Sequence, residues 1–232
     1  MGPVTILPVT GLPEVRPGDV LAELIAARAD LADGDVVVVT QKVVSKAEGR
    51  LVPVDPGDRL AVTAVVEAES TRVIRRRGDL LMTETRHGFV CANAGVDLSN
   101  VERGWAALLP LHPDHSARRI RDGLRARTGR QVAVVVSDTF GRTWRQGVTD
   151  VAIGCAGVAG VVDLRGTPDA LGRELTATEV CVADEIAGAA ELAMGKASGV
   201  PVAVVRGLDP AWLRESSVAA EIVRPHAEDL FR

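Results

Sequence analysis

Short runs of apolar, mostly β-branched residues recur along the chain, and each ends at turn-forming or polar residues. Runs of this length are typical of strands that are buried in a sheet. They predict strands at Val4–Val9, Val36–Thr40, Val132–Val136 and Val200–Val205, and shorter strands at Leu80–Thr83 and Phe89–Ala92.

Longer segments between these runs repeat apolar residues at helical spacing. They predict helices from Asp19, as the capping residue, to about Ala29, from about Leu60 to Arg76, from about Ser116 to Thr128 and from about Thr178 to Met194. The basic run Arg75–Arg77 then falls at a helix C-terminus, where positive charge is favourable. The stretch from Asp209 to Arg232 is less regular.

A polar segment, Ser137–Gly147, directly follows the strand predicted at Val132–Val136. Open α/β sheets bind ligands at such strand ends. Asp138 and Thr139 offer hard oxygen ligands for Mg²⁺ or Mn²⁺, and Arg142 and Arg145 offer guanidinium groups for phosphate or carboxylate. The segment read alone equally fits a capped strand end with surface arginines.

Two other polar segments favour the chemical interpretation. Asp97 follows a glycine in a tight turn, and its carboxylate could converge with Asp138 on one divalent cation. Lys42 and Lys46 are four residues apart, so they share a face if their segment is helical. Carboxylates for a metal together with lysines and arginines for phosphate oxygens describe phosphoryl chemistry.

Composition narrows the remaining classes of function. The 232 residues carry a net charge of -4, contain no Tyr and only 3% aromatic residues, so nonspecific nucleic-acid binding is not expected. Cys91, Cys155 and Cys181 form no CxxC pattern, which argues against a zinc site and indicates a reducing compartment. No signal peptide, transmembrane-length run, P-loop or GxGxxG motif is visible, and we expect a cytoplasmic protein without membrane or nucleic-acid partners.

The same polar segments resemble the coenzyme F420-0:L-glutamate ligase family, the γ-glutamyl ligases of deazaflavin cofactor biosynthesis, found also as the N-terminal domain of a bifunctional actinobacterial ligase. The resemblance spans roughly residues 4 to 207 and rests on blocks in the family's order. The blocks are Gly11–Glu14 with Pro17–Asp19, Gln41–Arg50, Thr83–Asp97 with Ser99 and Asn100, and Asp138–Gly147, with weaker matches at Asp169–Leu175 and Val200–Gly207.

The resemblance implies a mixed α/β (α+β) fold with mixed sheets, an intertwined homodimer, and a ligase domain at residues 1–207. Residues 208–232 would be a tail, or the start of a linker to a flavin-binding, reductase-like domain. The metal would be held by Asp97 and Asp138, with Thr139 near a second ion. The GTP site would be lined by Leu12, Pro13, Glu14, Val15, Gln41, Lys42, Lys46, Asn100, Gly195, Lys196, Ala197 and Ser198. Lys196 is positively charged, which disfavours a second metal ion at its loop.

The implied reaction uses GTP, Mn²⁺ or Mg²⁺ (one ion or two) and K⁺. GTP phosphorylates the terminal carboxylate of F420-0, and the amine of L-glutamate attacks the acyl phosphate, with release of GDP and phosphate. Arg142, Arg145 and Arg165 are our candidates for anionic substrate groups, which the resemblance does not assign. Two alternatives stay open: a ligase of the same mechanism for another carboxylate, and a GTP-binding sensor without chemistry.

Overall fold

The computed structural model describes residues 2–229. Its helices are α1 (Leu21–Ala26), α2 (Gln41–Ala47), α3 (Arg59–Ala68), α4 (Pro113–Thr128), α5 (Val182–Met194) and α6 (Val218–Glu221), with short 3-10 turns η1 (Asn93–Gly95), η2 (Pro210–Trp212) and η3 (His226–Glu228). Its strands are β1 (Thr5–Pro8), β2 (Val36–Thr40), β3 (Leu51–Pro53), β4 (Ser70–Arg77), β5 (Leu80–Thr85), β6 (Val90–Ala92), β7 (Trp105–Ala107), β8 (Ala133–Arg142), β9 (Arg145–Ala156), β10 (Val162–Asp163), β11 (Glu179–Val180) and β12 (Val202–Arg206). Across residues 2–229, every helix is too short or too polar to cross a bilayer.

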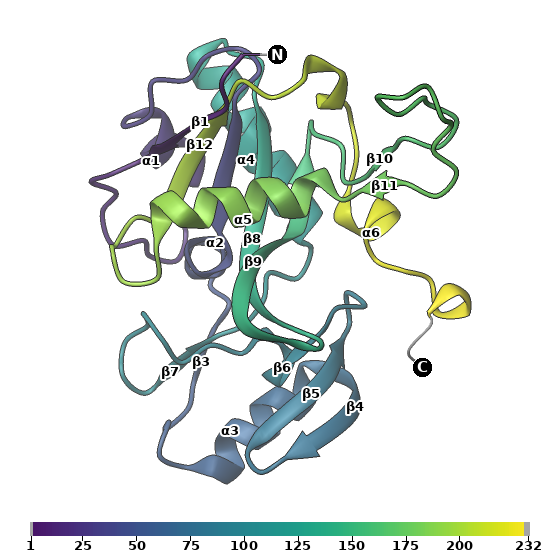
Figure 1. Cartoon of the computed structure of the whole chain (residues 1–232). Helices are drawn as coiled ribbons and strands as arrows, with labels where there is room; N and C mark the ends of the chain where they lie inside the picture. The colour runs from purple at the N-terminus through teal and green to yellow at the C-terminus, as the bar shows by residue number, and fades with distance from the viewer. Residues whose placement is uncertain (1, 230–232) are drawn as a thin grey trace.

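A five-stranded sheet in the order β1-β12-β2-β8-β9 forms the larger region of the molecule, drawn in the upper half of Figure 1. β2 and β8 are parallel and in register from Val36 opposite Ala133 to Thr40 opposite Ser137, while the other neighbours are antiparallel. The predicted strands at Val36–Thr40 and Val132–Val136 therefore lie side by side, and β2 ends beside Ser137 of β8.

Helices cover both faces of this sheet. Val37 and Val39 of β2 share an apolar cluster with residues of α1 and α4, such as Ile25 and Leu124. Val36 and Val38, which point to the opposite face because side chains alternate along a strand, pack with Ile186 and other residues of α5. Burial on both faces explains why these strands are continuous valine runs.

A smaller region lies below the sheet in Figure 1 and consists of α3, the three-stranded sheet β4-β5-β6 and the β3–β7 ribbon. Its own core is small, formed by Val66, Leu81 and Ala94. The polypeptide enters this region after α2 and returns to the larger one before α4, so the two regions meet beside the end of β2.

The C-terminal segment packs against the larger region. The Asp114 carboxylate accepts hydrogen bonds from the N–H groups of Val218 (2.8 Å) and Ala219 (3.1 Å), which caps α6. The Glu221 carboxylate accepts the N–H groups of Gly160 and Val161. The domain boundary at residue 207 stays a prediction, but the chain beyond it contributes contacts to the described fold.

The helix predicted over residues 60–76 is wrong in its second half. Helix α3 ends at Ala68 and the chain turns into strand β4, which pairs with β5 from Ser70 opposite Thr85 to Arg77 opposite Leu80. Thr71, Val73 and Ile74 favour a strand because they are β-branched. The basic run Arg75–Arg77 consequently ends an edge strand, not a helix.

Smaller corrections concern element ends. Asp19 does not cap α1, since its carboxylate accepts the Arg16 N–H and the helix begins at Leu21 after an N-cap, Val20, that makes no side-chain hydrogen bond. Helix α5 begins at Val182, not near Thr178. The segment Ser137–Gly147 is not a loop: β8 continues to Arg142 because β9 returns antiparallel beside it, with Asp138 opposite Val151.

Candidate functional site

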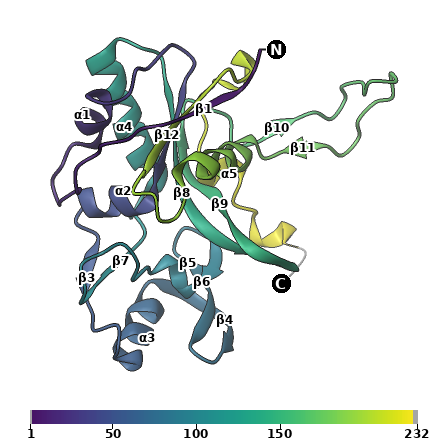
Figure 2. The same cartoon turned by 60° about the vertical axis from the view of Figure 1, so that its left-hand side comes forward.

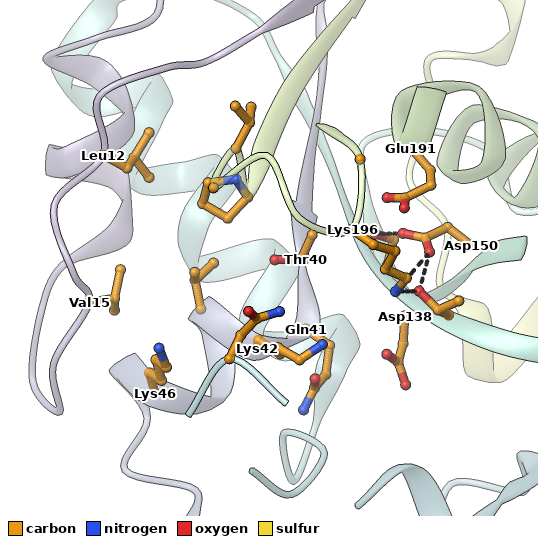
Figure 3. A pocket seen from close by; sticks show the side chains of 18 of the residues that line it. Leu12, Val15, Thr40, Gln41, Lys42, Lys46, Asp138, Asp150, Glu191 and Lys196 are labelled. Carbon is orange, nitrogen blue, oxygen red and sulfur yellow. Dashed lines mark hydrogen bonds and ion pairs between the residues drawn. The ribbon is translucent and has the colours of Figure 1, made fainter. Parts of the chain in front are cut away.

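One pocket of about 400 Å³ lies at the junction of the two regions, where β2 ends beside Ser137 of β8. Figure 3 shows its side chains entering from α2, from the β8–β9 hairpin, from the end of α5 and from the N-terminal segment. Every residue predicted for GTP lines this pocket except Ser198, which lies in the adjoining loop and contacts the Met194 carbonyl oxygen. The structure thus brings together segments that are up to 185 residues apart in sequence, from Leu12 to Ala197.

Helix α2 begins directly after β2, so Lys42 and Lys46 project from the first two turns of a helix at the strand end. Both line this pocket, which agrees with the shared helix face that their spacing predicted. Lys42 Nζ lies 2.6 Å from Asp97 Oδ2, and Lys46 Nζ contacts Glu14. The buried Gln41 amide Nε2 donates to Ser45 Oγ and to the Leu108 carbonyl oxygen, which anchors α2 to the segment that follows the smaller region.

Asp97 comes from the smaller region and is positioned by the turn before it. Gly95 has a φ of +69°, and a Cβ at this position would lie 2.7 Å from Leu109, so glycine is required. The Ser99 N–H donates to Asp97 Oδ1 at 2.7 Å. Burial raises the pKa of Asp97, but the hydrogen bonds from Lys42 and Ser99 outweigh it and hold the pKa below its ordinary value.

Asp138, on β8, has the opposite electrostatic character. Burial raises the pKa of its carboxyl from 3.8 to about 7; the Thr139 N–H and Lys42 oppose the rise, and the negative charges of Asp97 and Asp150 add to it. Carboxylates that repel one another in a buried site are stabilised by a cation placed between them.

The hairpin also supplies Asp150, which the sequence analysis missed. Asp150 of β9 stands opposite Thr139 of β8, and its two oxygens accept hydrogen bonds from the hydroxyls of Ser137 and Thr139. Glu191, near the end of α5, lines the same side of the pocket and was also missed. The only signal in the sequence was an isolated acid, Asp150, in the largely apolar stretch from Val148 to Ala156.

The three candidate arginines lie outside the pocket lining. Arg142 and Arg145 pair at the exposed tip of the β8–β9 hairpin, where Arg142 donates to the Gln146 carbonyl oxygen. Arg165 lies between β10 and β11 and pairs with Asp163 and Glu179. The contact of these side chains with substrate stays a prediction.

The donor set suits a divalent cation that is shared with a phosphate ligand. Within residues 2–229, no three histidine, cysteine, aspartate or glutamate side chains are grouped so that they form a metal site by themselves. Mg²⁺ and Mn²⁺ need fewer protein ligands, because Mg²⁺ in particular keeps waters and binds one or two carboxylates plus phosphate oxygens. Asp138, with its raised pKa, and Asp97 beside it fit that pattern.

Comparison with known proteins gives consistent matches. A sequence profile described as F420-0:gamma-glutamyl ligase matches residues 11–207. The coenzyme F420:L-glutamate ligase of Methanothermobacter thermautotrophicus is 41% identical over 99% of each chain. Proteins of the same description from Methanopyrus kandleri and Archaeoglobus fulgidus are 44% identical over 94% of each chain, and 43% identical over 99% of this chain and 96% of their own, respectively.

Proposed function

Because the chain belongs to the F420-0:gamma-glutamyl ligase family, it adds glutamate to F420-0, and we propose that GTP drives this reaction in the pocket between the two regions. One observation carries the proposal: Asp97, from the smaller region, forms an ion pair with the pocket-lining Lys42, and the charges of both act on Asp138, which lines the pocket. A purely structural junction gains nothing from a buried carboxyl whose ionisation is opposed.

The reaction proceeds in two displacements. An oxygen of the F420-0 carboxylate forms a bond to the γ-phosphorus of GTP while the bond to the leaving GDP oxygen breaks. The glutamate nitrogen then attacks the acyl carbon of this acyl phosphate, the phosphate leaves, and the nitrogen loses a proton as the amide forms. Both steps gain from positioning and from charge neutralisation, which is what the pocket offers.

The side chains divide this work. Lys42, Lys46 and Lys196 neutralise the phosphate oxygens. The nucleoside contacts the part of the pocket wall that is formed by Leu12–Val15 and Asn100. Asp97 and Asp138 would hold Mn²⁺ or Mg²⁺, whereas Thr139, which was expected near a second ion, accepts a hydrogen bond from Lys196. The ion supplies Lewis-acid polarisation of the phosphate when it is bound. K⁺ is a further cation that the family resemblance suggests.

Arginine side chains are proposed to bind the anionic groups of F420-0 and glutamate. Arg142 and Arg145 lie at the tip of the β8–β9 hairpin, whose β8 strand carries Asp138, so a long acceptor with its carboxylate beside Asp138 could reach toward them. Arg165 is the third candidate. Arg145→Ala is expected to raise the KM for F420-0 or glutamate about tenfold, since an anion contact contributes about 1–2 kcal/mol. Unchanged KM values for both substrates would exclude this role.

A homodimer is also part of the proposal. The hairpin that joins β10 to β11 extends away from the body of the molecule in Figure 2 and exposes 81% of Leu171 near its tip. An apolar side chain on a projecting arm suits contact with a second copy. Light scattering of the purified protein gives the mass directly, and a monomer at micromolar concentration would contradict this part.

Incubation with GTP, Mn²⁺, L-glutamate and F420-0, read by mass spectrometry, tests the function. We expect one glutamyl residue added per GDP released, and a loss of at least about 100-fold in Asp138→Asn. Nucleotide binding without GDP release in the presence of both substrates would indicate a sensor. GDP release only with a different carboxylate would indicate a ligase for another acceptor.

A further inference from the structure

The pocket has a second acidic corner, distinct from the pair Asp97 and Asp138. It is formed by Asp150, Thr139 and Glu191, from β9, β8 and α5. The Asp150 side chain is 2% exposed and accepts hydrogen bonds from two hydroxyls, those of Ser137 and Thr139. A carboxylate buried in this way needs a positive charge nearby.

The Lys196 ammonium occupies this corner. Nζ donates to Thr139 Oγ1, whose own hydroxyl donates to Asp150 Oδ1, and Nζ lies 3.9 Å from that same carboxylate oxygen. Figure 3 shows Lys196 beside Asp150, with dashed lines for the contacts in this corner. Glu191 belongs to the same group, since burial and the charge of Asp150 raise its pKa while Lys196 and Lys42 lower it.

The loop that carries Lys196 leaves α5 through Gly195, at a φ of +62°. The side chain then reaches across the pocket to the hairpin. The Lys196 backbone belongs to the larger region, as do Asp150, Thr139 and Glu191. The contact of Lys196 with these residues therefore does not depend on the smaller region. Hydroxyl and carboxylate oxygens arranged around one cation are also the donors that a divalent ion would use.

We propose that Lys196 is a built-in cation that takes the place of a second divalent ion, so that the protein binds one metal ion, at Asp97 and Asp138. This inference rests on the proposed function and specifies the charge arrangement of its site. Two-metal sites place a cation on each side of a transferring phosphate. Here the ammonium supplies the second positive charge, and a divalent ion in contact with the same oxygens is repelled by it.

The test is the number of Mn²⁺ ions bound per protein, measured by electron paramagnetic resonance of free Mn²⁺ without nucleotide. We expect one ion for the wild type and two for Lys196→Ala and Lys196→Glu, with the second ion bound more tightly in Lys196→Glu because a carboxylate is added. Lys196→Arg keeps the charge and should bind one. Lys46→Ala, which removes an ammonium from the Glu14 side of the same pocket, should also bind one.

Two ions on the wild type, or one ion on both Lys196→Ala and Lys196→Glu, would overturn the inference. A gain of a second ion in Lys46→Ala as well would show that overall pocket charge, not the Lys196 contact, sets the number. Absence of Mn²⁺ from the wild type would instead contradict the metal site of the proposed function, so the two failures are distinguishable.

Discussion

The two regions of the molecule differ in how much apolar surface they bury. In the larger region, β2 and β8 are enclosed on both faces by α1, α4 and α5, and Val36–Val39 are fully buried. The smaller region relies on three core residues and leaves most of β4 exposed. The larger region is therefore a rigid frame, whereas the smaller one has little apolar burial of its own to hold it.

The difference matters because the proposed site takes residues from both regions. Lys42, Asp138 and Asp150 belong to elements of the larger region. Asp97 and Asn100 belong to the smaller, weakly packed region. Only one carboxylate of the proposed metal pair is thus held by extensive burial. Anything that loosens the smaller region should disturb the metal site before it disturbs the fold.

Matched leucine truncations give the largest expected effect. Leu81→Ala and Leu124→Ala each remove a buried side chain, one from each region, at a local cost of about 2–5 kcal/mol. Leu124→Ala should lower the global unfolding midpoint. Leu81→Ala should instead speed hydrogen exchange mainly in residues 80–97 and weaken Mn²⁺ binding. Equal loss of protection throughout both variants would show that the regions unfold as one unit.

A matched pair of glycine substitutions tests how Asp97 is positioned. Both Gly95 and Gly78 have positive φ, so alanine costs about 1–2 kcal/mol at either position, but only at Gly95 does a Cβ meet another side chain, Leu109 at 2.7 Å. Gly95→Ala should weaken Mn²⁺ binding about tenfold, or about 1.4 kcal/mol, because the turn must shift to avoid Leu109 and moves Asp97 with it. Gly78→Ala should change stability only. Similar Mn²⁺ affinities for the two variants would contradict this role of the turn.

The pH dependence of metal binding follows from Asp138. Its carboxyl has a pKa of about 7 in the metal-free protein, and a metal binds the ionised form. Mn²⁺ affinity should therefore fall about tenfold for each pH unit below 7. Mn²⁺ titrations at pH values on both sides of that pKa of about 7 measure the effect. A flat profile would mean that Asp138 is ionised throughout.

The raised pKa of Asp138 affects the stability of the metal-free fold in the opposite direction: low pH weakens metal binding but stabilises the fold. The folded pKa of Asp138 is above its unfolded value of 3.8, so the fold binds the proton more tightly, and metal-free stability falls as pH rises from about 4 through about 7. Asp138→Asn should remove this part of the decline and be more stable than the wild type at pH 8. Urea unfolding with a chelator present checks the slope.

Sequence patterns predicted the larger region better than the smaller one for a physical reason. Strands such as Val36–Thr40 are buried on both faces, so their residues are apolar without interruption. The stretch from Ser70 to Arg77 lies at an exposed edge and carries charges, so its three β-branched residues are not part of an uninterrupted apolar run. Arg77 pairs with Leu80 across the two-residue turn Gly78–Asp79, which is a local hairpin signal that the helix prediction overlooked.

The site shows the same limit. Asp97, Asp138 and the lysines stand in polar segments that end apolar runs or follow a tight turn, and they could be singled out. Asp150 and Glu191 reach the pocket only because β9 pairs with β8 and α5 crosses the sheet. The spacing of residues in the sequence reveals neither the β8–β9 pairing nor the path of α5. The position of the Lys196 ammonium near Asp150 depends on the same packing.

The most direct measurement of the central claim is Mn²⁺ affinity in Asp97→Asn and Asp138→Asn, compared with the wild type at pH 8. If one cation joins carboxylates of both regions, each variant loses at least about tenfold in affinity, since each removes a charged ligand. Wild-type affinity in Asp97→Asn, with loss in Asp138→Asn alone, would place the ion entirely within the larger region and contradict the account.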